Sequence, residues 1–139
     1  MLGGMASEST MFDRAGGERF FETLTQRFYD SVATDPVLRP LYPGDSEGFE
    51  AARVHLKLFL MQYWGGPSIY QSSRGAPQLR ARHARFAIGP AERDAWVEHM
   101  SAAVRAGGLK PLDESQMLSY LAAAASHLVN TDAEPAIDA

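Results

Sequence analysis

The chain contains no cysteine among its 139 residues. Disulfides, thiolate zinc sites, iron–sulfur clusters and covalent attachment through a Cys-x-x-Cys-His motif all need cysteine. Any prosthetic group must therefore be held non-covalently.

Net positive charge is lacking as well. The formal charge is -4 at pH 7 and the pI is near 5.5, which argues against a protein that binds nucleic acid through a net positive charge. A local basic patch runs from Arg74 to Arg85. We expect no nucleic-acid partner.

Long apolar runs are also missing, so no membrane span is expected. Residues 1–10 have neither a basic start nor a sustained apolar stretch, which excludes a secretory signal and favours a cytoplasmic protein. With 45% hydrophobic residues the chain has enough apolar material for one core. We predict a single domain over residues 12–130 between flexible tails at 1–11 and 131–139.

Strand-type alternation is absent, and apolar residues recur at three- and four-residue steps. The pattern predicts an all-helical domain of four main helices plus short ones. The four apolar stripes are Phe20, Phe21, Leu24, Phe28 and Val32; Phe49, Ala52, Leu56, Phe59, Leu60 and Tyr63; Trp96, Met100, Ala103 and Val104; and Met117, Leu121, Ala124 and Leu128.

The segments between the stripes carry turn and capping signals. Residues 65–78 are rich in Gly, Pro and Ser and show no helical stripe, which predicts a long loop. A short helix is expected over 79–85, and Gly89-Pro90 predicts the start of the next helix. Asp113 and Gln116 form a candidate capping pair for the last helix.

The most informative residue is His83, in the stretch Arg80-Ala-Arg-His-Ala-Arg-Phe86. Its imidazole can coordinate iron, and the three neighbouring arginines suit a dianionic ligand such as a haem with two propionates. A histidine in a basic helix is commonly a solvated surface residue, and from this segment alone that interpretation stays open.

Three bulky residues with polar tips, Tyr29, Tyr42 and Trp96, lie on the apolar stripes or at their ends. Each needs a hydrogen-bond partner when buried, so together they can line a cavity that holds a small polar ligand. Alternatively, each is a core or boundary aromatic residue whose polar tip faces water.

The order and spacing of several motifs resemble the truncated haemoglobins, in particular their second group, over residues 12–130. These motifs are Gly16-Gly17, Arg27-Phe28-Tyr29, Leu41-Tyr42-Pro43, Phe59-Leu60-Met61-Gln62-Tyr63-Trp64-Gly65-Gly66-Pro67, Leu79-Arg80-Ala81-Arg82-His83 and Glu92-Arg93-Asp94-Ala95-Trp96. The resemblance implies a two-over-two helical sandwich around a non-covalent b-type haem, with His83 as the proximal iron ligand. Diatomic gases would bind on the opposite side, where Tyr29, Tyr42 and Trp96 match the distal donors.

The resemblance also implies roles for the second stripe. Ala52 falls where many globins place a distal histidine, which leaves stabilisation of the gas to the aromatic donors. Leu56 and Phe59 should pack on the haem and restrict access, a role close to that of ordinary core residues. His55 should point off the distal face, toward a propionate or solvent.

Further contacts to the cofactor are implied for Tyr63, Arg82, Phe86 and His55. An arginine suits bidentate binding of a carboxylate, although a solvated surface charge is the competing interpretation for Arg82.

Three functions remain open from the sequence. The first is a haem globin that binds dioxygen, CO and NO, releases dioxygen slowly and serves oxygen transport, as a monomer or homodimer. The second is a haem enzyme with peroxidase-like or nitric oxide dioxygenase activity; no acid neighbours His83 in the sequence, and a separate reductase would be required because no flavin or nicotinamide motif is present. The third is a haem-free helical interaction module.

Overall fold

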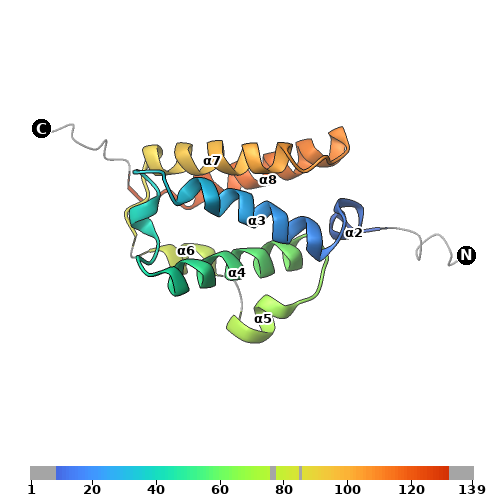
Figure 1. The fold of residues 1–139 in the computed structure, drawn as a ribbon, viewed down its shortest axis with the longest axis horizontal. Coiled ribbons are helices and arrows are strands. Elements are labelled where there is room, and N and C mark those ends of the chain that lie inside the picture. The colour runs from blue at the N-terminus through green and yellow to red at the C-terminus, as the bar shows by residue number, and fades with distance from the viewer. Residues whose placement is uncertain (1–8, 76–77, 85, 132–139) are drawn as a thin grey trace, which may run out of the picture.

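A computed structural model describes residues 9–75, 78–84 and 86–131, and over these residues the chain is helical without a strand (Figure 1). The predicted all-helical class is therefore confirmed. The elements are α2 (Met11–Ala15), α3 (Glu18–Val32), the 3-10 helix η1 (Arg39–Leu41), α4 (Ser46–Tyr63), α5 (Ile69–Arg74), α6 (Leu79–His83), α7 (Pro90–Arg105) and α8 (Pro111–His127).

The four long helices form two packed pairs. Helix α3 packs against both α4 and α7, and α7 packs against α8. Figure 1 shows α7 and α8 side by side along one edge of the molecule and α4 on the opposite side of α3. The short helix α6 carries His83 at its last position. None of the described helices is long and apolar enough to cross a membrane.

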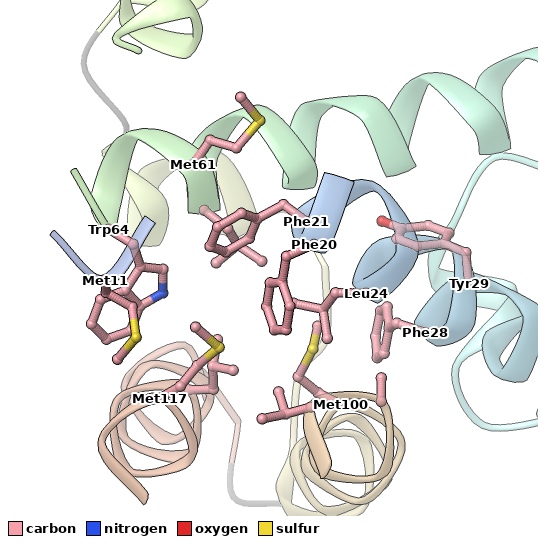
Figure 2. Packing of buried hydrophobic residues seen from close by; sticks show 14 of the residues in the cluster. Met11, Phe20, Phe21, Leu24, Phe28, Tyr29, Met61, Trp64, Met100 and Met117 are labelled. Carbon is pink, nitrogen blue, oxygen red and sulfur yellow. The ribbon is translucent and has the colours of Figure 1, made fainter. Parts of the chain in front are cut away.

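The apolar face of α3 forms the centre of the core. Gly16 and Gly17 adopt positive φ angles and turn the chain from α2 into α3. The predicted stripe of α3 is then buried, with Phe21, Leu24 and Phe28 fully inaccessible. Figure 2 shows Leu24 and Phe28 beside Met100 of α7, and Phe21 further toward α4. Helix α3 is thus fixed between α4 and α7.

A partly buried charged network joins α3 to α4. The Arg53 guanidinium, only 5% exposed, donates to the Thr25 hydroxyl of α3 over 3.1 Å and to Glu50 over 3.0 Å. One turn later, the Lys57 ammonium donates to Glu18 and Glu22 of α3, at 2.9 Å each. These contacts fix the position of α4 along α3, and with it the residues that α4 contributes to the interior.

The expected loop over residues 65–78 was wrong in part, because it contains α5. This helix is too short to show a periodic stripe, and tertiary contacts stabilise it. Tyr70 is buried and packs edge-on against Phe59, while the Gln71 backbone N–H donates to the Gln62 side chain over 2.9 Å.

The expected capping pair of the last helix was also wrong. Helix α8 starts earlier, with Lys110 as N-cap and Pro111 at the first helical position, so Asp113 lies inside the first turn. Its carboxylate instead accepts from Arg14 Nε over 3.2 Å. The predicted start of a helix at Gly89-Pro90 is confirmed.

Two other expectations concern the ends of elements. The short helix expected over 79–85 spans Leu79–His83, and Arg85 lies outside the described residues. Of the expected tails, residues 1–8 and 132–139 lie outside them as well. Met11 belongs to α2 and is buried.

We predict that Phe21→Ala lowers the free energy of unfolding by about 3–5 kcal/mol, because it leaves a cavity in a close-packed core. Phe21 is fully buried and its ring contacts Phe12 and Phe20. Thr23→Ala, an exposed position on the same helix, should change it by less than about 0.5 kcal/mol. Urea denaturation followed by circular dichroism measures both; equal effects would contradict the assigned core.

Candidate functional site: a cavity between the two helix pairs

A cavity of about 350 Å³ lies within the helical frame. Its volume falls within the range of about 300–1,000 Å³ that is typical of pockets for small molecules and cofactors. The cavity brings together nearly all of the residues that the sequence singled out: Tyr29, Tyr42, Ala52, His55, Leu56, Phe59, Arg82, His83, Phe86 and Trp96. Residues from α3 to α8 thus converge on one space.

His83 is held in a defined orientation at the end of α6. Its Nδ1 lies 2.7 Å from the backbone carbonyl oxygen of Leu79, one turn earlier. Because a carbonyl only accepts hydrogen bonds, Nδ1 is the donor in this contact. Both residues line the cavity. A histidine that binds a metal through Nε2 donates from Nδ1 in the same way.

Three donor side chains from different elements line the same cavity. Tyr29 comes from α3, Tyr42 follows η1, and Trp96 comes from α7. The Tyr29 and Tyr42 rings lie 5.4 Å apart between centroids, and Phe49 packs edge-on against both. The Trp96 ring packs against Phe28 at 5.4 Å. Aromatic packing therefore fixes the donors in place.

Burial keeps the two tyrosines protonated. It raises the pKa of Tyr42 to about 12, and hydrogen bonding with Tyr29 and Trp96 acts in the opposite direction. The pKa of Tyr29 is also raised far above its ordinary value. Burial is the main cause, and the neighbouring Tyr42 is the second. Both hydroxyls are thus neutral donors across the physiological pH range.

Helix α4 supplies an apolar wall to the cavity. Ala52, Leu56 and Phe59 lie on it at three- and four-residue steps, and none has a polar side-chain atom. His55 also lines the cavity, although its position beside Leu56 had predicted a direction off this face.

Charged residues meet the cavity from α6 and α7. Arg82 comes from α6, and its guanidinium carbon lies 5.8 Å from the centre of the Tyr70 ring. Arg93 of α7 lines the cavity too, donating from Nε to Asp94 over 2.7 Å. Two guanidinium groups at one cavity suit a ligand with carboxylates.

Tyr63 lies outside the cavity lining. Its side chain is 49% exposed, and its ring stacks on that of Tyr120 with centroids 3.9 Å apart. Tyr120, from α8, does line the cavity. Tyr63 therefore approaches the cavity only through Tyr120.

Several contacts stabilise the chain between α3 and α4, which carries Tyr42. Arg39 Nη1 donates to the carbonyl oxygen of Pro43 over 2.8 Å, and its guanidinium carbon lies 4.1 Å from the Phe49 ring centre. At the end of α3, Asp35 Oδ2 lies 2.6 Å from His99 Nε2 of α7. His99 thus connects α7 to the segment that follows α3.

Sequence reasoning missed several lining residues: Leu38, Leu41, Tyr70, Leu79, Ile88, Glu92, Arg93 and Tyr120. Tyr70 lies in the segment read as a loop, and Tyr120 is one position away from the apolar stripe of α8. Arg93 was part of a quoted motif without an assigned role. Their approach to the cavity depends on the tertiary arrangement, which no local pattern encodes.

Comparison with known proteins adds an independent line of observation. The model of the bacterial-like globin family matches residues 10–130. The chain is 40% identical over 119 residues to the Group 2 truncated hemoglobin YjbI of Bacillus subtilis, covering 85% of this chain and 88% of the relative.

Solved structures give a similar result. The thermostable hemoglobin from the actinobacterium Thermobifida fusca matches with a TM-score of 0.84 and 49% identity, covering 88% of this chain and 98% of that one. The truncated oxygen-avid haemoglobin from Bacillus subtilis matches with a TM-score of 0.80 and 35% identity, covering 88% and 100%.

We predict a pH-dependent contribution of the Asp35–His99 pair to stability. The contact with His99, then those with the Leu38 and Val37 backbone N–H groups, lower the pKa of Asp35 from 3.8 in the unfolded chain. Because the folded pKa is the lower one, this carboxylate stabilises the fold above pH 3.8 and loses that effect as the pH falls through the folded pKa.

The test compares the native chain with Asp35→Asn. The difference in their free energies of unfolding should be fully present above pH 3.8 and should shrink as the pH falls below that value. Asp30→Asn, at an exposed position of α3, controls for the change in net charge. A difference that is constant with pH would contradict the ionic role of Asp35.

Proposed function

The chain belongs to the bacterial-like globin family and is a truncated haemoglobin of the second group, and from this premise we propose that His83 binds a b-type haem that takes up dioxygen. A bound haem would supply an iron that coordinates diatomic gases reversibly. CO and NO are further ligands of the same class.

The observation that carries this proposal is the hydrogen bond between His83 Nδ1 and the Leu79 carbonyl oxygen. Because Nδ1 is engaged with this carbonyl, Nε2 is the ring nitrogen that would bind the iron, and His83 lines the cavity. The surrounding lining fits a haem as well, because it is mostly apolar and carries Arg82 and Arg93, which suit two propionates. His55 and Phe86 also line the cavity as proposed cofactor contacts, and Tyr63 would act on the haem only through Tyr120.

The donors at the cavity support slow release of dioxygen. Tyr29 and Tyr42 keep their hydroxyl protons at neutral pH, and the Trp96 indole N–H is a donor at every pH. Donors held in place by aromatic packing would stabilise the partial negative charge of a bound gas. Ala52 has no hydrogen-bond donor in its side chain, so stabilisation of the gas depends on the three aromatic residues. One similar protein, from Bacillus subtilis, is described as oxygen-avid, in line with this proposal.

The arrangement favours reversible binding over peroxidase chemistry. A peroxidase gains from a carboxylate on the proximal histidine, whereas His83 Nδ1 donates to a backbone carbonyl. Tyr29 and Tyr42, with their raised pKa values, are also poor at the proton exchange near neutral pH that peroxide cleavage needs. Nitric oxide dioxygenase activity, with an external reductase, is the second candidate because it needs no such group. A cytoplasmic location and a monomeric or homodimeric state stay predictions.

We predict that the purified protein, reconstituted with haem, shows visible absorption bands that shift on reduction and on addition of CO. His83→Ala should lose most of its haem, because no other side chain is proposed to hold the iron. His127→Ala, at an exposed position of α8, should retain the native spectrum. A His83→Ala protein with unchanged bands would contradict the assignment of the ligand, and a protein that stays colourless with haem would favour the interaction module.

We predict that Tyr29→Phe and Trp96→Phe each release dioxygen about tenfold faster, since each loses one hydrogen-bond donor of about 1.4 kcal/mol. Stopped-flow displacement of dioxygen by CO measures the rates. Tyr63→Phe makes the same chemical change outside the cavity lining and should leave the rate unaltered. Equal rates in all variants would contradict the role of the distal donors.

A further inference from the structure

One exposed residue beyond the end of α8, Asn130, makes an unusual set of contacts to the segment that follows α6. Its side-chain Nδ2 donates to the carbonyl oxygens of Phe86, over 2.8 Å, and His83, over 3.3 Å. Its Oδ1 accepts from the Ile88 backbone N–H over 2.9 Å, and its own backbone N–H donates to the Ile88 carbonyl oxygen over 2.8 Å. The amide thus bonds to three residues of the same short segment.

The segment has little regular structure to hold it. Helix α6 contains only five residues, Leu79–His83, and among the described residues that follow, the next helix begins at Pro90. A helix of this length is unstable on its own, because the free energy gained from one turn does not offset the cost of nucleation. The Phe86 backbone N–H donates to the His83 carbonyl oxygen over 3.0 Å, and external contacts add to this local bond in fixing the backbone of His83.

We infer that Asn130 is a positioning residue for the iron ligand, an inference that rests on the proposed function. The bond from His83 Nδ1 to the Leu79 carbonyl sets the rotation of the imidazole. The bond from Asn130 to the His83 carbonyl oxygen fixes the backbone that carries that imidazole. Together they determine where Nε2 stands in the cavity, and the second bond couples the end of α8 to the proximal side of the haem.

The chemistry of the contact is specific to an amide. The site offers two carbonyl acceptors and one N–H donor, which match the two donors and one acceptor of an asparagine side chain. An aspartate keeps the bond to Ile88 but places a carboxylate oxygen against the carbonyls of His83 and Phe86. An alanine loses all three side-chain bonds.

The test compares the haem-loaded native protein with Asn130→Ala, Asn130→Asp and Gln116→Ala. Gln116 is an exposed amide residue on α8 and serves as the matched control. The first readout is the rate of haem loss to an excess of apomyoglobin. The second is the iron–histidine stretching band of the ferrous protein in resonance Raman spectra, which reports on the proximal bond itself and which a general loss of stability would not shift.

We expect Asn130→Ala to lose haem about tenfold faster, the scale on which partners of metal ligands act, and to shift the stretching band. Asn130→Asp should be affected at least as strongly, and Gln116→Ala should match the native protein. If Asn130→Ala loses its helical circular dichroism, Asn130→Asp decides the question by the same two readouts.

Two failures are distinguishable. Native protein that takes up no haem, or shows no iron–histidine band, overturns the proposed function. Native protein with the band, together with Asn130 variants whose haem loss and band are unchanged, overturns the positioning role alone.

Discussion

The site depends on one hydrogen bond, from His83 Nδ1 to the backbone carbonyl oxygen of Leu79. It fixes the rotation of the imidazole and makes Nδ1 the donor, which leaves Nε2 as the ring nitrogen for a metal. The bond forms within one helical turn, yet that turn belongs to a helix too short to persist alone. The rest of the structure therefore has to hold α6 in place, and Asn130 provides one such connection from the far end of the chain.

The opposite side of the cavity is built by packing. Tyr29, Tyr42 and Trp96 come from three elements, and their rings contact each other or phenylalanines of the core. Burial keeps both hydroxyls protonated, and the network of Arg53 and Lys57 holds α4 against α3. The same interactions that stabilise the fold thus prepare a set of rigid hydrogen-bond donors.

The sequence predicted the parts of the molecule that repeat or match a family pattern. The four stripes identified the long helices because their buried faces recur with the helical period, and the ordered motifs identified the truncated-globin fold, which the comparisons confirm. Contacts between distant positions could not be predicted from local patterns. Arg14 binds Asp113, which was expected to cap a helix, and Tyr70 is buried although its segment was expected to be a loop. Asn130 forms a hydrogen bond with the segment after His83.

The most direct test of the account is the NMR spectrum of the 15N-histidine-labelled protein before and after haem addition under CO, which keeps ferrous iron diamagnetic. We predict that the His83 ring shows a hydrogen-bonded proton on Nδ1 without haem, and that on haem addition the Nε2 signal shifts strongly while the Nδ1 proton stays. A His83 ring without a proton on Nδ1, or a His83 signal that does not respond to haem, would contradict the central role of this imidazole.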